Sequence, residues 1–165
     1  MATVHREPGP AAPILTKVIA QLDGKVGKVG WFAGNNYPDG GPPVALVAAV
    51  NEHGWPEHNI PPRLGMRATA ERMQGQWAAV ARSVSKRVLA GQITPDMALD
   101  IIGQKAAGDV RKNIANVTTP PLKVDTIKAR LRGKNQGRVV SLTIAKPLVA
   151  SGHLLNSLTN TVEKE

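Results

Sequence analysis

The feature that most constrains the fold is a pair of long helical patterns joined by a very short connection. Apolar residues recur at helical spacing over Met66–Leu89: Ala70, Met73, Trp77, Val80, Ala81, Val84 and Val88. A second stripe contains Leu99, Ile102, Ala106, Val110, Ile114 and Val117. Because only a few residues separate the two patterns, they predict an antiparallel helical hairpin. Trp77 keeps the register of its stripe, so we interpret it as a core residue and not as a platform for stacking bases.

Local signals mark the ends of the second helix. Thr94 is a suitable N-cap, Pro95 a favourable first residue, and Asp96 an acid near the positive end of the helix dipole. Inside the helix, Gly103 and Gly108 each cost roughly 0.5–1 kcal/mol relative to alanine. We expect such glycines where another helix packs closely.

Alternating segments before and after the hairpin predict strands. They cover residues 25–32, 138–145 and 159–162. The fold class predicted is α+β, with a small antiparallel sheet packed against one side of the long helical hairpin. A first helix is expected over residues 14–22, and short helices over residues 125–132 and 151–157. Residues 1–12 are rich in Pro, Gly and Ala and predict a flexible, extended arm, which leaves residues 13–165 as a single domain.

Residues 44–67 predict a short apolar helix that runs into a rigid, proline-rich corner. Gly54 is placed to end the helix with a positive φ, and prolines at 56, 61 and 62 make the loop stiff without secondary structure of its own. The corner is expected to present Trp55 and Arg63, beside Pro61 and Pro62, to a protein partner.

The net charge of +9 is concentrated in two stretches. Residues 63–87 carry a net charge of +5, and residues 123–146 carry +6. Within the second stretch lies a basic loop whose cations are Lys128, Arg130, Arg132, Lys134 and Arg138. Such charge favours contact with a polyanion such as DNA, and the alternative explanations are a solvated face or an acidic partner subunit.

Motifs for catalysis are missing from the sequence. It contains no cysteine, no GxxxxGK[ST] loop, no GxSxG elbow and no HExxH helix. His53, Glu57 and His58 are close in sequence, but Gly54 and Pro56 interrupt any helical face that would align them on a metal. We therefore expect no enzyme, no cofactor and no metal. No signal peptide and no apolar run of membrane-spanning length is present, so the expectation is a soluble intracellular product without membrane contact.

Two short motifs resemble a family of tailed-bacteriophage neck and tail-completion proteins, of the lambdoid minor tail protein Z and Mu virion-morphogenesis type. The first is Asn51-Glu52-His53-Gly54 followed by Ile60-Pro61-Pro62-Arg63, and the second is KPLVASGHLLNS at residues 146–157. Residues 92–113 are similar to the middle helix of the family, so the resemblance covers most of residues 25–163. Leu64-Gly65 and Ala150-Ser151 depart from the usual Pro-Phe and Asp-Thr.

The resemblance implies a structural virion protein that forms a homo-oligomeric ring, with six-fold symmetry favoured, at the head–tail neck or the head-proximal end of the tail. Its implied partners are other neck, connector or tail-tube proteins, and its implied location is the virion, after assembly in the host cytoplasm. In such a ring the basic loop would face packaged DNA without reading its sequence. The alternative is a free-standing basic nucleic-acid-binding protein, although both hairpin helices are long for a helix–turn–helix.

Overall fold

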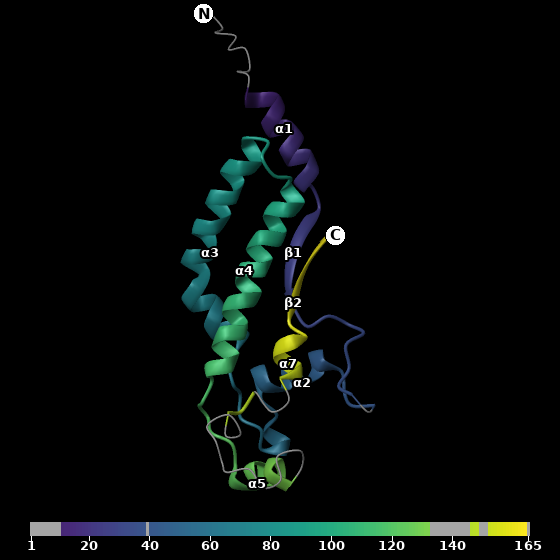
Figure 1. Cartoon of the computed structure of the whole chain (residues 1–165), viewed down its shortest axis with the longest axis vertical. Coiled ribbons are helices and arrows are strands. Elements are labelled where there is room, and N and C mark those ends of the chain that lie inside the picture. Colours follow the sequence, from purple (N-terminus) through teal and green to yellow (C-terminus); the bar gives the residue numbers. More distant parts are fainter. Residues whose placement is uncertain (1–10, 39, 133–145, 149–151, 165) are drawn as a thin grey trace, which may run out of the picture.

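The computed structural model describes residues 11–38, 40–132, 146–148 and 152–164. Its elements are, in chain order, α1 (Ala11–Leu22), β1 (Lys25–Gly30), α2 (Val44–His53), the 3-10 turn η1 (Pro56–His58), α3 (Met66–Leu89), α4 (Pro95–Asn116), α5 (Val124–Arg132), α7 (His153–Asn156) and β2 (Thr159–Lys164). In Figure 1, α3 and α4 run side by side along the molecule, α1 lies near their connection, and α5 lies beyond their other end. The predicted α+β class is confirmed.

The helical hairpin forms as the sequence predicts. The backbone N–H of Met97 donates to Thr94 Oγ1 at 3.2 Å, so Thr94 is the N-cap of α4. Gly91 takes a φ of +70° in the connection, a conformation that glycine adopts without strain. Val84 and Val88 of α3 pack with Ile93 and Ala98 in a small core at this end of the hairpin.

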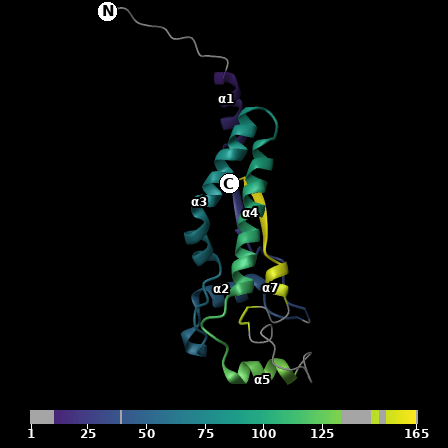
Figure 2. The same ribbon diagram turned by 60° about the vertical axis from the view of Figure 1, so that its left-hand side comes forward.

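The described sheet has two strands, β1 and β2, paired antiparallel with Lys25 opposite Lys164 and Gly30 opposite Thr159. Helix α4 contacts both strands as well as α3, so the hairpin packs on the sheet through α4. Figure 2 shows the strands beside α4. The predicted first strand is shorter than expected, the last is longer, and the strand predicted over residues 138–145 lies outside the described residues.

A strand, not a helix, is the close neighbour of Gly103. A Cβ added at Gly103 would lie 2.9 Å from Cβ of Asn160 in β2, whereas a Cβ at Gly108 would meet nothing within 4 Å. The expectation that both glycines mark helix contact is therefore wrong. The close approach of β2 to α4 lets Nδ2 of Asn160 donate a hydrogen bond to Oδ1 of Asp100 in α4, at 2.6 Å.

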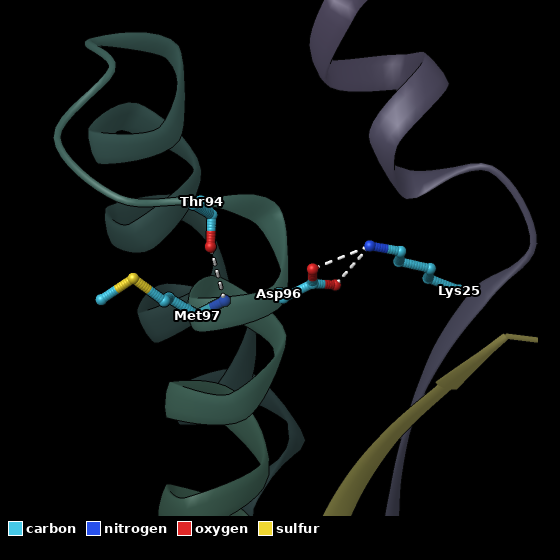
Figure 3. Close-up of polar contacts among 4 residues, drawn as sticks. All are labelled: Lys25, Thr94, Asp96 and Met97. Carbon is cyan, nitrogen blue, oxygen red and sulfur yellow. Dashed lines mark hydrogen bonds and ion pairs between the residues drawn. The ribbon is translucent and has the colours of Figure 1, made fainter.

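An ion pair joins the start of β1 to the start of α4. Nζ of Lys25 contacts Oδ1 of Asp96 at 2.6 Å and Oδ2 at 2.8 Å, next to the Thr94 cap (Figure 3). Both side chains are partly exposed, so the pair adds about 1 kcal/mol at most. It adds one polar contact to the packing of α4 on β1.

The larger core lies at the opposite end of the hairpin. There α2, the C-terminal half of α4 and the segment from Leu148 to Leu158 bury their apolar side chains: Val44, Ala48, Val110, Ile114, Leu148, Leu154 and Leu158. Trp31 joins this core and donates its indole N–H to the carbonyl of Leu154 at 2.7 Å. Helix α2, which leads into the first sequence motif, thus meets Leu148 and Leu154 of the second motif across one core.

Candidate functional site

A carboxylate from α2 caps the N-terminus of α3 at the proline-rich corner. Oε2 of Glu52 accepts the backbone N–H of Gly65 at 2.7 Å and of Met66 at 2.9 Å, and Oε1 accepts that of Arg67 at 2.8 Å. Gly65 has no side chain to cap its own helix, so Glu52 supplies both the acceptors and a negative charge at the positive end of the helix dipole. This contact sets the direction in which α3 leaves the corner.

The loop of the corner is more ordered than the sequence suggests. It contains η1, and Trp55 and Ile60 exchange backbone hydrogen bonds of 2.8 and 3.0 Å around it. The expectation of a loop without secondary structure is therefore wrong. Gly54 does take the predicted positive φ, of +77°, and a Cβ there would come within 2.9 Å of the Ile60 carbonyl oxygen and of Pro62. The backbone of the corner is therefore folded on itself and closely packed around Gly54.

Arg63 requires a correction, since it is not presented to a partner. The residue is only 7% exposed. Its Nε donates to the carbonyl of Pro120 at 3.1 Å and its Nη2 to that of Pro121 at 3.3 Å. Burial lowers the pKa of Arg63 below its ordinary value. The guanidinium thus connects the segment after α4 to the corner. No local sequence pattern predicts that these distant carbonyls are its partners.

The other corner residues remain accessible. Trp55 is 42% exposed, and its ring lies 3.8 Å from that of His58, measured between centroids. Pro62 is exposed and Pro61 is half-buried. Trp55 and Pro62 therefore stay candidates for a protein contact.

Only part of the predicted basic loop is described. Lys128 and Arg132 are exposed on α5, whereas Lys134 and Arg138 lie outside the described residues. Arg130 donates to the carbonyls of Lys146 at 2.7 Å and Pro147 at 2.9 Å. Burial, and then the charge of Arg63, lowers the pKa of Arg130. These two bonds hold its guanidinium against the chain, and the expectation that Arg130 faces DNA stays a prediction.

A cavity of about 480 Å³ lies between the corner and the segment after α4. Its lining includes Arg63, Arg130 and Lys123 beside Tyr37, whose pKa is raised by burial. The described residues contain no group of three or more His, Asp or Glu that could hold a metal ion. His53 instead lies 3.3 Å from the guanidinium of Arg67, measured from Nδ1 to Nη2.

A half-buried charge cluster lies between the two helices of the hairpin. Asp109 is 11% exposed, receives Nζ of Lys105 at 2.6 Å, and accepts the indole N–H of Trp77 at 2.8 Å. Burial alone would raise the pKa of Asp109, but these two bonds and the charges of Lys105 and Lys112 outweigh it and hold the pKa below its ordinary value. Trp77 is half-buried and belongs to neither hydrophobic core, so the prediction of a core residue is wrong.

Helix α1 exposes large aliphatic side chains on one face. We call this surface the α1 apolar face; it consists of Ile14, Leu15, Ile19 and Leu22, which are 47%, 50%, 60% and 37% exposed. Val18, on the same stripe, packs against the small core at the end of the hairpin. The face is continuous with Leu89, which is 46% exposed and lies with Ile14 and Leu15 around one shallow hollow. The sequence predicts the helix but not that its stripe stays half-uncovered.

A second apolar surface lies between α3, α4 and β1. We call it the α3–β1 groove; its volume is about 430 Å³. It is lined by Gly27, Val29, Met66, Arg67, Ala70, Trp77, Leu99, Ile102, Gly103, Ala106 and Val110. Arg67 is the one charged residue among these. Because the lining comes from three segments far apart in sequence, no local pattern could have predicted the groove.

The exposed side of α3 carries most of the basic residues of the hairpin. Five cations on it are exposed: Arg67, Arg72, Arg82, Lys86 and Arg87. Glu71 is the acidic residue of that helix. Among the described residues, no helix is both long and apolar enough to span a membrane.

Comparison of the chain with known protein families, with curated proteins and with solved structures finds no match.

Proposed function

We propose that the chain is a structural subunit of a tailed-phage particle, which forms a ring at the head–tail neck or at the head-proximal end of the tail and is needed for joining heads to tails. In this role it performs no catalysis. The observation that carries the proposal is the α1 apolar face, whose four aliphatic side chains are between 37% and 60% exposed. Contiguous apolar surface of this kind marks an interaction site.

The resemblance described above supports the same role. Its motif residues act in architecture: Glu52 caps α3, Gly54 shapes the corner, and Arg63 fastens the segment after α4. A subunit that transmits shape through an assembly benefits from such a fixed joint between helices. None of these contacts activates a nucleophile or polarises a substrate.

Deletion of the reading frame from the phage genome that encodes the chain tests the proposal. We expect filled heads and separate tails, with infectivity restored when the chain is supplied in trans. Electron microscopy of lysates distinguishes separate parts from joined particles. Intact, infective particles from the deleted genome would reject the role.

Contact with packaged DNA is a separate part of the proposal. Lys128 and Arg132 are exposed on α5 and are suited to sequence-independent contact with phosphates. Lys128→Gln with Arg132→Gln should reduce DNA retention or passage while leaving ring assembly unchanged. Unaltered infectivity of such particles would reject the contact.

The alternative is a free-standing nucleic-acid-binding protein, and the five exposed cations on α3 favour it. Binding through phosphates would weaken steeply as salt is raised. A salt-dependent shift of a DNA duplex by the purified chain, together with normal particles from the deleted genome, would favour this alternative over the structural role.

A further inference from the structure

We propose that the α1 apolar face of one copy docks into the α3–β1 groove of the next copy, which makes a head-to-tail interface. The inference rests on the proposed structural role and names the surfaces through which the subunits associate. When two different patches form the contact, a row of copies has one unused patch of each kind at its two ends. The row closes into a ring when the rotation between successive copies brings these two patches together.

The two surfaces cannot satisfy each other within one chain. Val18 holds α1 against Val84, Val88 and their neighbours at the connection end of the hairpin. The groove is lined instead by the first half of α3, from Met66 to Trp77, and by the adjoining part of α4. From Trp77 to Val84 the axis of α3 advances about 10 Å at 1.5 Å per residue. Each copy therefore offers both an uncovered apolar helix face and an uncovered apolar groove.

The dimensions of the helix and the groove agree. Helix α1 has 12 residues, and the groove wall from Met66 to Trp77 has the same number. Each is about 18 Å long at 1.5 Å per residue.

Charge sets the direction of the docked helix. Arg67 is the charged residue of the groove lining and lies at the start of α3, whereas α1 is followed by the exposed Asp23. Placing Asp23 beside Arg67 orients α1 antiparallel to α3 of the neighbouring copy. Counting along both helices then puts Ile19 level with Ala70, since Ile19 lies about 6 Å from Asp23 and Ala70 about 4.5 Å from Arg67.

Complementary variants test this interface. Ile19→Glu disables the α1 face, and Ala70→Glu disables the groove; both residues are exposed, so neither change disturbs the core. Light scattering across a concentration series should show that each variant alone associates at least tenfold more weakly than the unchanged chain. An equimolar mixture should form a 1:1 dimer and nothing larger, because each pair retains one intact face and one intact groove. Leu46→Glu, at an exposed position of α2, is the matched control and should assemble normally.

The same measurements separate the alternatives. If α1 packs on α1 of another copy, Ala70→Glu associates like the unchanged chain, and the inference is overturned. If the unchanged chain stays monomeric up to about 100 µM, a concentration at which even weak association would be detected, the docking is also overturned. The deletion experiment is independent of both results. If the chain proves necessary for joining heads to tails but Ala70→Glu assembles normally, docking in the groove is refuted and the structural role is retained.

Disulfide trapping checks the predicted register. The chain contains no cysteine, so introduced thiols have no competitors. Ile19→Cys mixed with Ala70→Cys should give a cross-linked heterodimer under mild oxidation. A cross-link formed by Ile19→Cys alone, with none to Ala70→Cys, contradicts the proposed pairing.

Discussion

The Glu52 cap is the contact whose loss is best worked out from the structure. Glu52→Ala removes the acceptor for three backbone N–H groups, at 2.7, 2.9 and 2.8 Å. Those of Gly65 and Met66 are partly buried and regain water poorly, while that of Arg67 is exposed and is rehydrated. One lost N-cap bond costs about 0.5–2 kcal/mol, so we expect the free energy of unfolding to fall by about 2–3 kcal/mol.

Urea denaturation followed by far-ultraviolet circular dichroism measures this loss, at one fixed protein concentration so that association is held constant. For a chain of this size the same change lowers Tm by about 5–10 °C. Glu71→Ala is the control, because it removes the same charge from an exposed position of α3. Its effect should stay within about 0.5 kcal/mol. Equal losses for the two variants, or no loss for Glu52→Ala, would refute the capping argument.

Four further substitutions probe other contacts. Arg63→Ala should lower the free energy of unfolding by about 2–3 kcal/mol in urea, because two proline carbonyls lose their donors and a buried side chain leaves a void. Gly103→Ala should destabilise by about 1–3 kcal/mol, since the new Cβ meets Asn160 at 2.9 Å, whereas Gly108→Ala meets nothing and should stabilise by about 0.5–1 kcal/mol. Equal effects at the two glycines would contradict the packing. The pKa of Asp109 is lower in the folded state, so its stabilisation is present above the unfolded value of about 3.9 and is lost as pH falls through the folded value. The Asp109→Asn variant should therefore be less stable than the unchanged chain at neutral pH. Its stability should also fall less than that of the unchanged chain on acidification below about pH 4, which thermal scans across pH would measure.

Several features of the fold could be predicted because their signals are local. The Thr94 cap and the positive φ of Gly54 depend on residues adjacent in the chain, and both are present. The spacing of apolar residues likewise predicts α3 and α4. The exposed Trp55 of the corner belongs with these features, since loops between helices lie at the surface.

The candidate site was predicted less well, because its partners are distant in sequence. Arginine is a residue type common at protein–protein contacts, yet Arg63 donates hydrogen bonds to carbonyls 57 and 58 residues away in the same chain. Arg130 is drawn inward in the same way by the carbonyl of Lys146. Whether a charged side chain is exposed or buried depends on which hydrogen-bond acceptors surround it. The sequence alone does not reveal those acceptors when they are distant along the chain.

By itself, then, the sequence determined the helices, their hairpin, the rigid corner and the excess of positive charge, since each follows from residue types at short spacing. Tertiary structure alone decided that Gly103 meets a strand, that the stripe of α1 stays half-uncovered and that β1, α3 and α4 enclose an apolar groove. The physical reason is that burial depends on how three or more segments pack together. A periodic pattern states which face of a helix is apolar, but only packing determines what covers it.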